Sequence, residues 1–152
     1  MDISGTFRFD HPQPAVWAIL TDADAIAAAL PGVHTLTPIP DQPLAWTAQI
    51  SLSFIAINAE LEGEVRLTDL NAPSNFRLSI LSGSGDSRLS GSALISLSSV
   101  EDAPIHTALT YTGAAEMTGK FAAMPSAIVK SVVMMLVRQY FMALSRQIAE
   151  GG

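Results

Sequence analysis

The chain has 152 residues, a length typical of a single domain, and we expect one domain over residues 1–152. Hydrophobic residues make up 49% of it and charged residues only 14%, which excludes the charged, apolar-poor composition of disordered chains. A net charge of −6 with no cluster of Lys and Arg argues against a nucleic-acid partner, and the lack of Cys excludes disulfides and thiolate metal sites.

The first element is predicted to be a strand. Residues 3–10 alternate apolar and polar side chains, which is the period of a strand with one buried face. No basic region followed by an apolar run precedes or overlaps this segment, so no signal peptide is expected. The default location is therefore the cytoplasm.

Two short helices are predicted after this strand. Residues 16–20 place apolar side chains on one helical face. Thr21 and Asp22 can cap a second helix, which Pro31 and Gly32 would end.

Residues 33–117 predict an antiparallel meander. Apolar and polar residues alternate almost throughout, with turn signals near residues 41–43, 71–74, 83–86 and 101–104. The inward positions change parity between Phe54 and Ile57, which predicts a tight turn there. We interpret the glycine-containing segment 83–87 as a hairpin turn and not a phosphate-binding loop, because a strand follows it.

A single long helix is predicted from about residue 125 to residue 150. Its main apolar stripe contains Val129, Val132, Val133, Leu136, Val137, Tyr140, Ala143 and Leu144. A second apolar arc contains Met124, Ile128, Met135 and Met142, and the remaining polar face is interrupted by Met134 and Phe141. Lys130 and Arg138 break the apolar run, so no transmembrane segment is expected. The excess apolar surface predicts contact with a second copy of the chain, a partner enzyme or the membrane surface.

No catalytic or metal-binding motif is found. The three histidines, at positions 11, 34 and 106, have no Cys, His or carboxylate at metal-ligand spacing, so neither a metal nor a cofactor is expected. Glu60, Glu62 and Glu64 repeat every second residue and share one face with Arg66. We interpret this run as a solvated outer surface, because acid–base catalysis would require dry surroundings.

The inward positions of the strands are small at their centre. The small residues are Ala59, Gly63, Gly91, Ala93, Gly113 and Ala115, and the bulky ones at the margins are Phe7, Phe9, Phe54, Phe76, Leu89 and Tyr111. One interpretation is a hollow beneath the long helix, for which we expect a volume above ~300 Å³. The other is that the glycines permit strong curvature or close approach of the helix. The pattern leaves both open.

Four motifs resemble those of one known family. Residues 14–22 (PAVWAILTD), 28–32 (AALPG), 61–65 (LEGEV) and 119–122 (GKFA) are similar to the carbon monoxide dehydrogenase G-subunit family of the START and birch-pollen-allergen (SRPBCC) superfamily. This resemblance implies an α+β helix-grip fold, with a curved antiparallel sheet of about seven strands, two short helices after the first strand, and a long C-terminal helix over a cavity. It also implies binding of lipid-like or quinone-like molecules, in some members in support of a molybdenum hydroxylase.

The expected function is non-catalytic binding of an apolar small molecule. The residues expected to line its cavity are Phe7, Phe9, Phe54, Leu61, Gly63, Phe76, Ile80, Gly91, Tyr111, Met117, Met124, Ile128 and Met135. The alternative is a cyclase or hydrolase on the same fold, which needs an inward polar group with a perturbed pKa. The nearest candidates for that role are Thr107, Tyr111 and Glu116.

Overall fold

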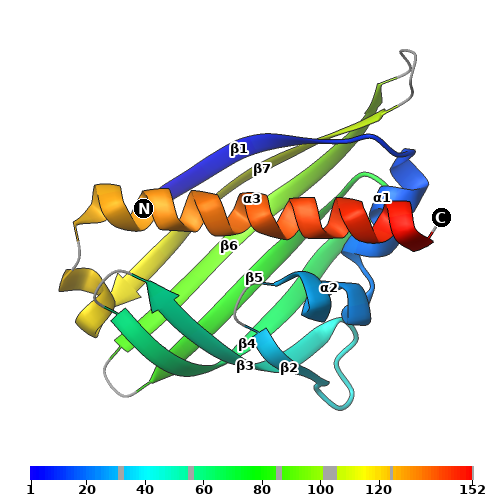
Figure 1. Cartoon of the computed structure of the whole chain (residues 1–152). Coiled ribbons are helices and arrows are strands. Elements are labelled where there is room, and N and C mark those ends of the chain that lie inside the picture. Colours follow the sequence, from blue (N-terminus) through cyan, green and yellow to red (C-terminus); the bar gives the residue numbers. More distant parts are fainter. Residues whose placement is uncertain (31–32, 55–56, 85–86, 101–105, 124, 152) are drawn as a thin grey trace.

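The structure, a computed structural model, describes residues 1–152 apart from 31–32, 55–56, 85–86, 101–105, 124 and 152 (Figure 1). Its elements in chain order are β1 (Asp2–Phe9), α1 (Gln13–Leu20), α2 (Ala23–Ala29), β2 (Val33–Pro38), β3 (Ala45–Phe54), β4 (Ile57–Asn71), β5 (Asn75–Ser84), β6 (Ser87–Val100), β7 (His106–Thr118), the 3₁₀ helix η1 (Gly119–Ala123) and α3 (Ser126–Gly151). The predicted order of strands and helices is confirmed.

The seven strands form one antiparallel sheet in the order β1-β7-β6-β5-β4-β3-β2. Phe54 pairs with Ile57, so the predicted change of parity falls at the β3–β4 hairpin, whose connecting residues 55–56 lie outside the described part. Ser84 pairs with Ser87, which confirms the hairpin predicted at residues 83–87. Its residues 85–86 also lie outside the described part of the chain. The sheet is thus the predicted meander with β1 added beside β7.

Two glycines lie where neighbouring strands approach closely. A Cβ atom on Gly113 would lie 2.0 Å from the Ser92 carbonyl oxygen, and one on Gly63 would lie 2.5 Å from that of Leu81. Both distances are far below van der Waals contact, so neither position accepts a side chain without movement of the neighbouring backbone. At these two positions the glycines allow the sheet to curve, as the second interpretation of the small residues requires.

The helices lie on the concave side of the sheet. α3 crosses that side along its length, and α1 and α2 pack near the C-terminal half of α3 (Figure 1). The Asp22 carboxylate accepts hydrogen bonds from the backbone N–H groups of Asp24 and Ala25 and caps α2 as predicted. Gln147 Nε2 donates to the Ala25 carbonyl oxygen at 3.1 Å and joins α3 to α2.

One side of α3 packs into the core of the domain. Phe141 is only 3% exposed, and its ring lies 5.4–6.2 Å, centroid to centroid, from four aromatic rings. These belong to Phe7, Phe9, Tyr111 and Tyr140. The prediction that Phe141 and Met134 interrupt the polar face is therefore wrong. Phe141 anchors the helix, and Met134 packs against the same core.

The opposite side of α3 faces away from the sheet. Ile128, Met135 and Met142 are 41%, 49% and 42% exposed. Residues seven apart in an α-helix lie nearly above one another, so these three form one line, called here the outer stripe. The expectation that Ile128 and Met135 face a cavity is corrected by this orientation.

By length and composition alone, α3 is apolar enough over Ser126–Glu150 to cross a membrane. The expectation that Lys130 and Arg138 exclude a membrane span is therefore wrong. In the structure the helix lies across the sheet and buries Val129, Tyr140 and Leu144 along with Phe141. Here α3 covers the concave side of the domain.

Candidate functional site

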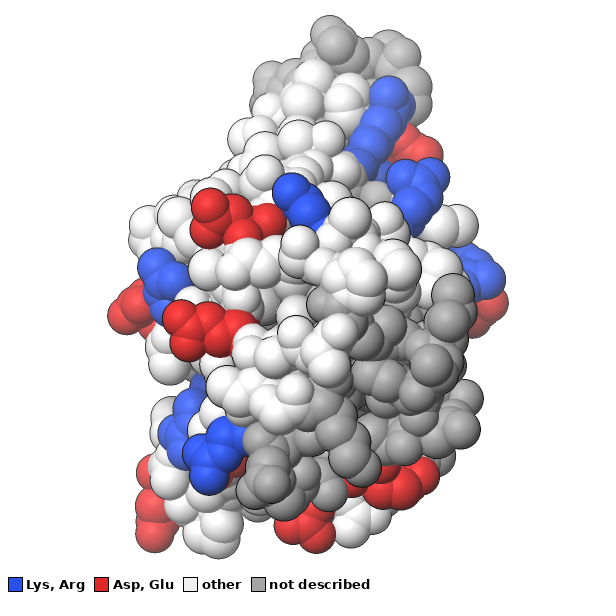
Figure 2. All heavy atoms as spheres, turned by 90° about the vertical axis from the view of Figure 1, so that its left-hand side faces the viewer, with Lys and Arg blue, Asp and Glu red and all other residues white. Residues whose placement is uncertain are grey.

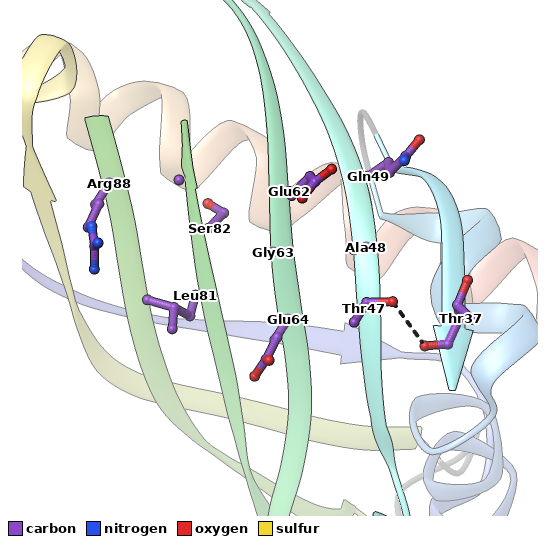
Figure 3. A pocket seen from close by; sticks show the side chains of 11 residues that line it. Thr37, Thr47, Ala48, Gln49, Glu62, Gly63, Glu64, Leu81, Ser82 and Arg88 are labelled. Atoms are coloured by element: carbon purple, nitrogen blue, oxygen red, sulfur yellow. Dashed lines mark hydrogen bonds between the residues drawn. The ribbon is translucent and has the colours of Figure 1, made fainter. Parts of the chain in front are cut away.

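The described residues form hollows on both sides of the sheet. On the outer side lies an open depression of about 680 Å³ (Figure 3). Its lining residues are Thr37, Thr47, Ala48, Gln49, Glu62, Gly63, Glu64, Leu81, Ser82, Gly83 and Arg88. Between the sheet and α3 lies a smaller cavity of about 230 Å³.

The outer depression is polar and accessible to solvent. Thr47 Oγ1 donates to the Thr37 carbonyl oxygen (Figure 3). Arg66 forms an ion pair with the Glu64 carboxylate at 3.0 Å. Glu60 and Glu62 are exposed, which confirms the predicted solvated outer surface. At the end of the molecule shown in Figure 2, which is the left-hand side of Figure 1, acidic and basic side chains are likewise interspersed among uncharged ones. Charges in this setting are screened by water, so the depression does not provide dry surroundings for catalysis.

The cavity beneath α3 is almost entirely apolar. It is lined from the sheet by Ile3, Leu61, Val65, Leu78, Ile80, Ser82, Leu89, Ser90, Gly91, Ser92, Ala93, Ile95, Tyr111 and Ala115, from α3 by Val133, Leu136, Val137, Tyr140 and Phe141, and by Leu30 after α2. Gly91 and Ala93 lie opposite Ala115 and Gly113 across β6 and β7, so small residues do leave space on this side. Both interpretations of the small residues therefore apply, at different positions.

Two tyrosines and three serines are among the residues that line this cavity. Ser82 Oγ donates to the Leu89 carbonyl oxygen at 3.4 Å, and the Tyr111 hydroxyl donates to the Met134 sulfur at 3.7 Å. Burial raises the pKa of Tyr111 and, more strongly, the pKa of Tyr140. Both phenols therefore stay protonated at neutral pH and act as hydrogen-bond donors.

The polar residues required by the enzyme alternative are not brought together. Tyr111 lines the cavity, but Thr107 is fully buried outside it and donates to the His11 carbonyl oxygen at 2.7 Å. Glu116 is exposed. The described lining contains no carboxylate and no histidine that could act on a bound molecule.

Four of the residues expected in the cavity line it, namely Leu61, Ile80, Gly91 and Tyr111. Phe9 and Phe76 pack within the core, Phe7 and Met117 pack against it and are partly buried, and Gly63 lines the outer depression. Ile128 and Met135 lie on the outer stripe. The side chains of Phe54 and Met124 lie outside the described residues.

The sequence reasoning missed the cavity residues on α3. Val133, Leu136, Val137 and Tyr140 belong to the main apolar stripe that the helical period identifies, whereas the residues expected in the cavity, Met124, Ile128 and Met135, belong to the second apolar arc. The wider and more continuous stripe was the better signal. The cavity is also smaller than the ~300 Å³ expected at the lower end of ligand pockets.

A curved antiparallel sheet closed by one long helix over an apolar cavity defines a helix-grip domain of the START type. The chain belongs to the carbon monoxide dehydrogenase G-subunit (CoxG) family, whose model matches residues 5–149. A comparison with curated proteins gives no match.

Solved structures show the same fold. A conserved protein from Geobacillus kaustophilus superposes with a TM-score of 0.91 at 23% identity, over 99% of this chain and 96% of that one. A START superfamily protein from Mycobacterium smegmatis gives a TM-score of 0.71 at 13% identity, over 99% of both chains. At these identities the likeness establishes the fold and not the ligand.

Proposed function

We propose that the protein binds a slender apolar small molecule in the cavity between α3 and the sheet, as a carrier or binding protein and not as an enzyme. The observation that carries this proposal is an apolar cavity whose wall is shared by the sheet and by α3. Membership of the CoxG family and the START-type fold support it.

The size of the cavity and its exposure to solvent support a slender molecule as the ligand. About 230 Å³ favours a slender chain over a bulky fused-ring molecule. Val133, Leu136 and Val137 line it yet remain half-exposed. A bound chain would remove these side chains from water, which stabilises the complex by roughly 25 cal/mol per Å² of apolar surface covered.

The test uses diphenylhexatriene, a rod-shaped neutral hydrocarbon that fluoresces in apolar surroundings. We expect it to bind the wild-type protein, and Val133→Trp, which fills the cavity from α3, to weaken its binding at least tenfold. Met135→Trp places the same side chain on the outer stripe and is the matched control, with binding unchanged. No binding to the wild type, or equal binding to both variants, would overturn the proposal.

We further propose that the outer stripe contacts an anionic membrane surface. Ile128, Met135 and Met142 are apolar and exposed, and Arg138 and Arg146 extend from the same side of α3. Within the described residues neither arginine forms an ion pair. Apolar side chains flanked by cations suit the interface of an anionic bilayer, where each cation contributes about 1 kcal/mol.

Co-sedimentation with vesicles tests this contact. The protein is expected to pellet with phosphatidylserine-containing vesicles more than with pure phosphatidylcholine, and less at high salt. Replacing both Met135 and Met142 by Ser should reduce pelleting severalfold. Equal pelleting of wild type and double variant would contradict the contact, and a dimeric mass by light scattering that this variant abolishes would assign the stripe to a second copy instead.

We also propose that the protein supports a molybdenum hydroxylase of the carbon monoxide dehydrogenase type in the cytoplasm. The family membership is the support for this role. Affinity purification of the tagged protein from its own host is expected to recover the subunits of such an enzyme. Recovery of none of them from cells that express the enzyme would contradict this role.

A further inference from the structure

We infer that the ligand is electrically neutral and carries a hydrogen-bond acceptor oxygen, such as that of a ketone or ester carbonyl, which the Tyr140 hydroxyl binds. The inference rests on the proposed function, because it assigns the chemistry of the molecule held in the cavity beneath α3. It names the polar contact that an otherwise apolar cavity offers.

Tyr140 lines the cavity and is only 6% exposed. Its hydroxyl makes no hydrogen bond with any described residue, whereas every fully enclosed side-chain N or O atom of the described part has a partner. The hydroxyl is therefore not fully enclosed, and the cavity is a hollow that Tyr140 lines. An acceptor oxygen on a bound ligand would give this hydroxyl the hydrogen-bond partner that the described residues do not supply.

Tyr111 offers a second donor among the residues that line the cavity. Its ring and that of Tyr140 lie on Phe141, at centroid distances of 5.7 and 5.4 Å. The Tyr111 hydroxyl donates only to the Met134 thioether, a weak acceptor that a carbonyl oxygen would replace. Gly5 makes room for this hydroxyl, because a Cβ atom there would lie 2.4 Å from the Tyr111 oxygen.

The surroundings favour a neutral ligand over a fatty-acid anion. No Lys, Arg or His is among the described residues that line the cavity. A carboxylate moved into apolar surroundings without a cation loses several kcal/mol of hydration. A carbonyl oxygen needs only the donors that the two phenols supply.

Displacement of diphenylhexatriene by three ten-carbon competitors tests the inference: 2-decanone, decane and decanoate. We expect Tyr140→Phe, which removes one oxygen atom, to weaken 2-decanone about 3- to 10-fold and to leave decane unchanged, in line with the loss of one hydrogen bond. Tyr111→Phe should weaken the binding of 2-decanone less. In the wild type the Tyr111 hydroxyl must give up its contact with Met134 before it can bind the ketone, so the net gain from this hydroxyl is smaller. Decanoate should displace the probe at least tenfold less effectively than 2-decanone.

Thr107→Val is the control, since it removes a buried hydroxyl that lies outside the cavity. It should leave the affinities for 2-decanone and decane unchanged. Equal 2-decanone affinities in wild type and Tyr140→Phe, or decanoate binding as tightly as 2-decanone, would overturn the inference while diphenylhexatriene still binds. Failure of diphenylhexatriene to bind the wild type would instead overturn the proposed function. Binding of diphenylhexatriene by Tyr140→Phe shows that this variant is folded.

Discussion

Single atoms decide which positions of the sheet accept a side chain. Gly113 and Gly91 lie on neighbouring strands and look equivalent in the sequence pattern. A Cβ atom on Gly113 would meet backbone at 2.0 Å, whereas the nearest atom to one on Gly91 is the Ala114 carbonyl oxygen at 3.3 Å. Gly113 therefore allows the close approach of β6 and β7 in the curved sheet, whereas Gly91 lines the cavity and leaves space there.

Gly113→Ala is expected to lower the free energy of unfolding by about 1–3 kcal/mol, because its methyl group forces β6 and β7 apart. Gly91→Ala is the matched control and should change stability by less than about 1 kcal/mol. Urea unfolding measures both. Equal stability of Gly113→Ala and wild type would show that the close approach of these strands is not needed for the curvature.

Burial of Tyr140 predicts a loss of stability at high pH. Because burial raises the pKa of Tyr140 above its ordinary value of 10.0, the folded state keeps the proton longer than the unfolded state does. The contribution of this pKa difference to the free energy of unfolding is complete below pH 10. It falls as the pH rises further, by at most about 1.4 kcal/mol per pH unit. Urea unfolding from pH 8 to pH 11 should show this decline, and Tyr140→Phe should reduce it. A Tyr140→Phe profile as steep as that of the wild type would contradict the assignment.

At the scale of elements, the rotation of α3 about its axis decides which side chains are core. The helix carries apolar residues on nearly all sides, so the sequence alone offers several faces for burial. The aromatic cluster around Phe141 selects one of them, because large rings gain most from close packing. The methionines on the other side are left in solvent.

Phe141→Ala is therefore expected to lower the free energy of unfolding by about 3–5 kcal/mol, the usual cost of removing a buried phenyl ring. Met135→Ala, on the outer stripe, should change it by no more than about 0.5 kcal/mol. Thermal and urea unfolding give both values. The reverse ranking would mean that the helix is rotated relative to the structure described.

For the whole molecule, the cavity on the concave side couples stability to ligand binding. One helix closes a seven-stranded sheet, and a cavity remains between them. A bound apolar molecule would add van der Waals contacts with the side chains that line the cavity. Because the cavity exists only in the folded state, such a ligand binds that state alone and stabilises it.

Saturation with 2-decanone is expected to raise the free energy of unfolding by about 2.7 kcal/mol when its free concentration is about one hundred times its Kd. Val133→Trp occupies the same space and should abolish this increase. Thermal unfolding with and without the ketone measures the effect. An equal increase in Val133→Trp would place the bound ketone outside the cavity.

The sequence by itself determined the elements, their order and the inward face of each strand, because periods of 2 and 3.6 residues are local properties. Leu61, Ile80, Gly91 and Tyr111 were found in this way, since strand parity fixes the side of the sheet on which each lies. Parity also placed Glu60 and Glu62 correctly on the solvated face.

Only the tertiary structure decided how α3 is rotated about its axis, and which glycine lies against neighbouring backbone and which lines the cavity. A helix that is apolar on several sides has no unique buried face until an aromatic cluster fixes one, so Phe141 and Tyr140 became core and Met135 did not. In the same way, how closely backbone of the neighbouring strand approaches Gly113 and Gly91 depends on the local bend of the paired strands β6 and β7. Both outcomes depend on contacts between distant segments, which no local period encodes.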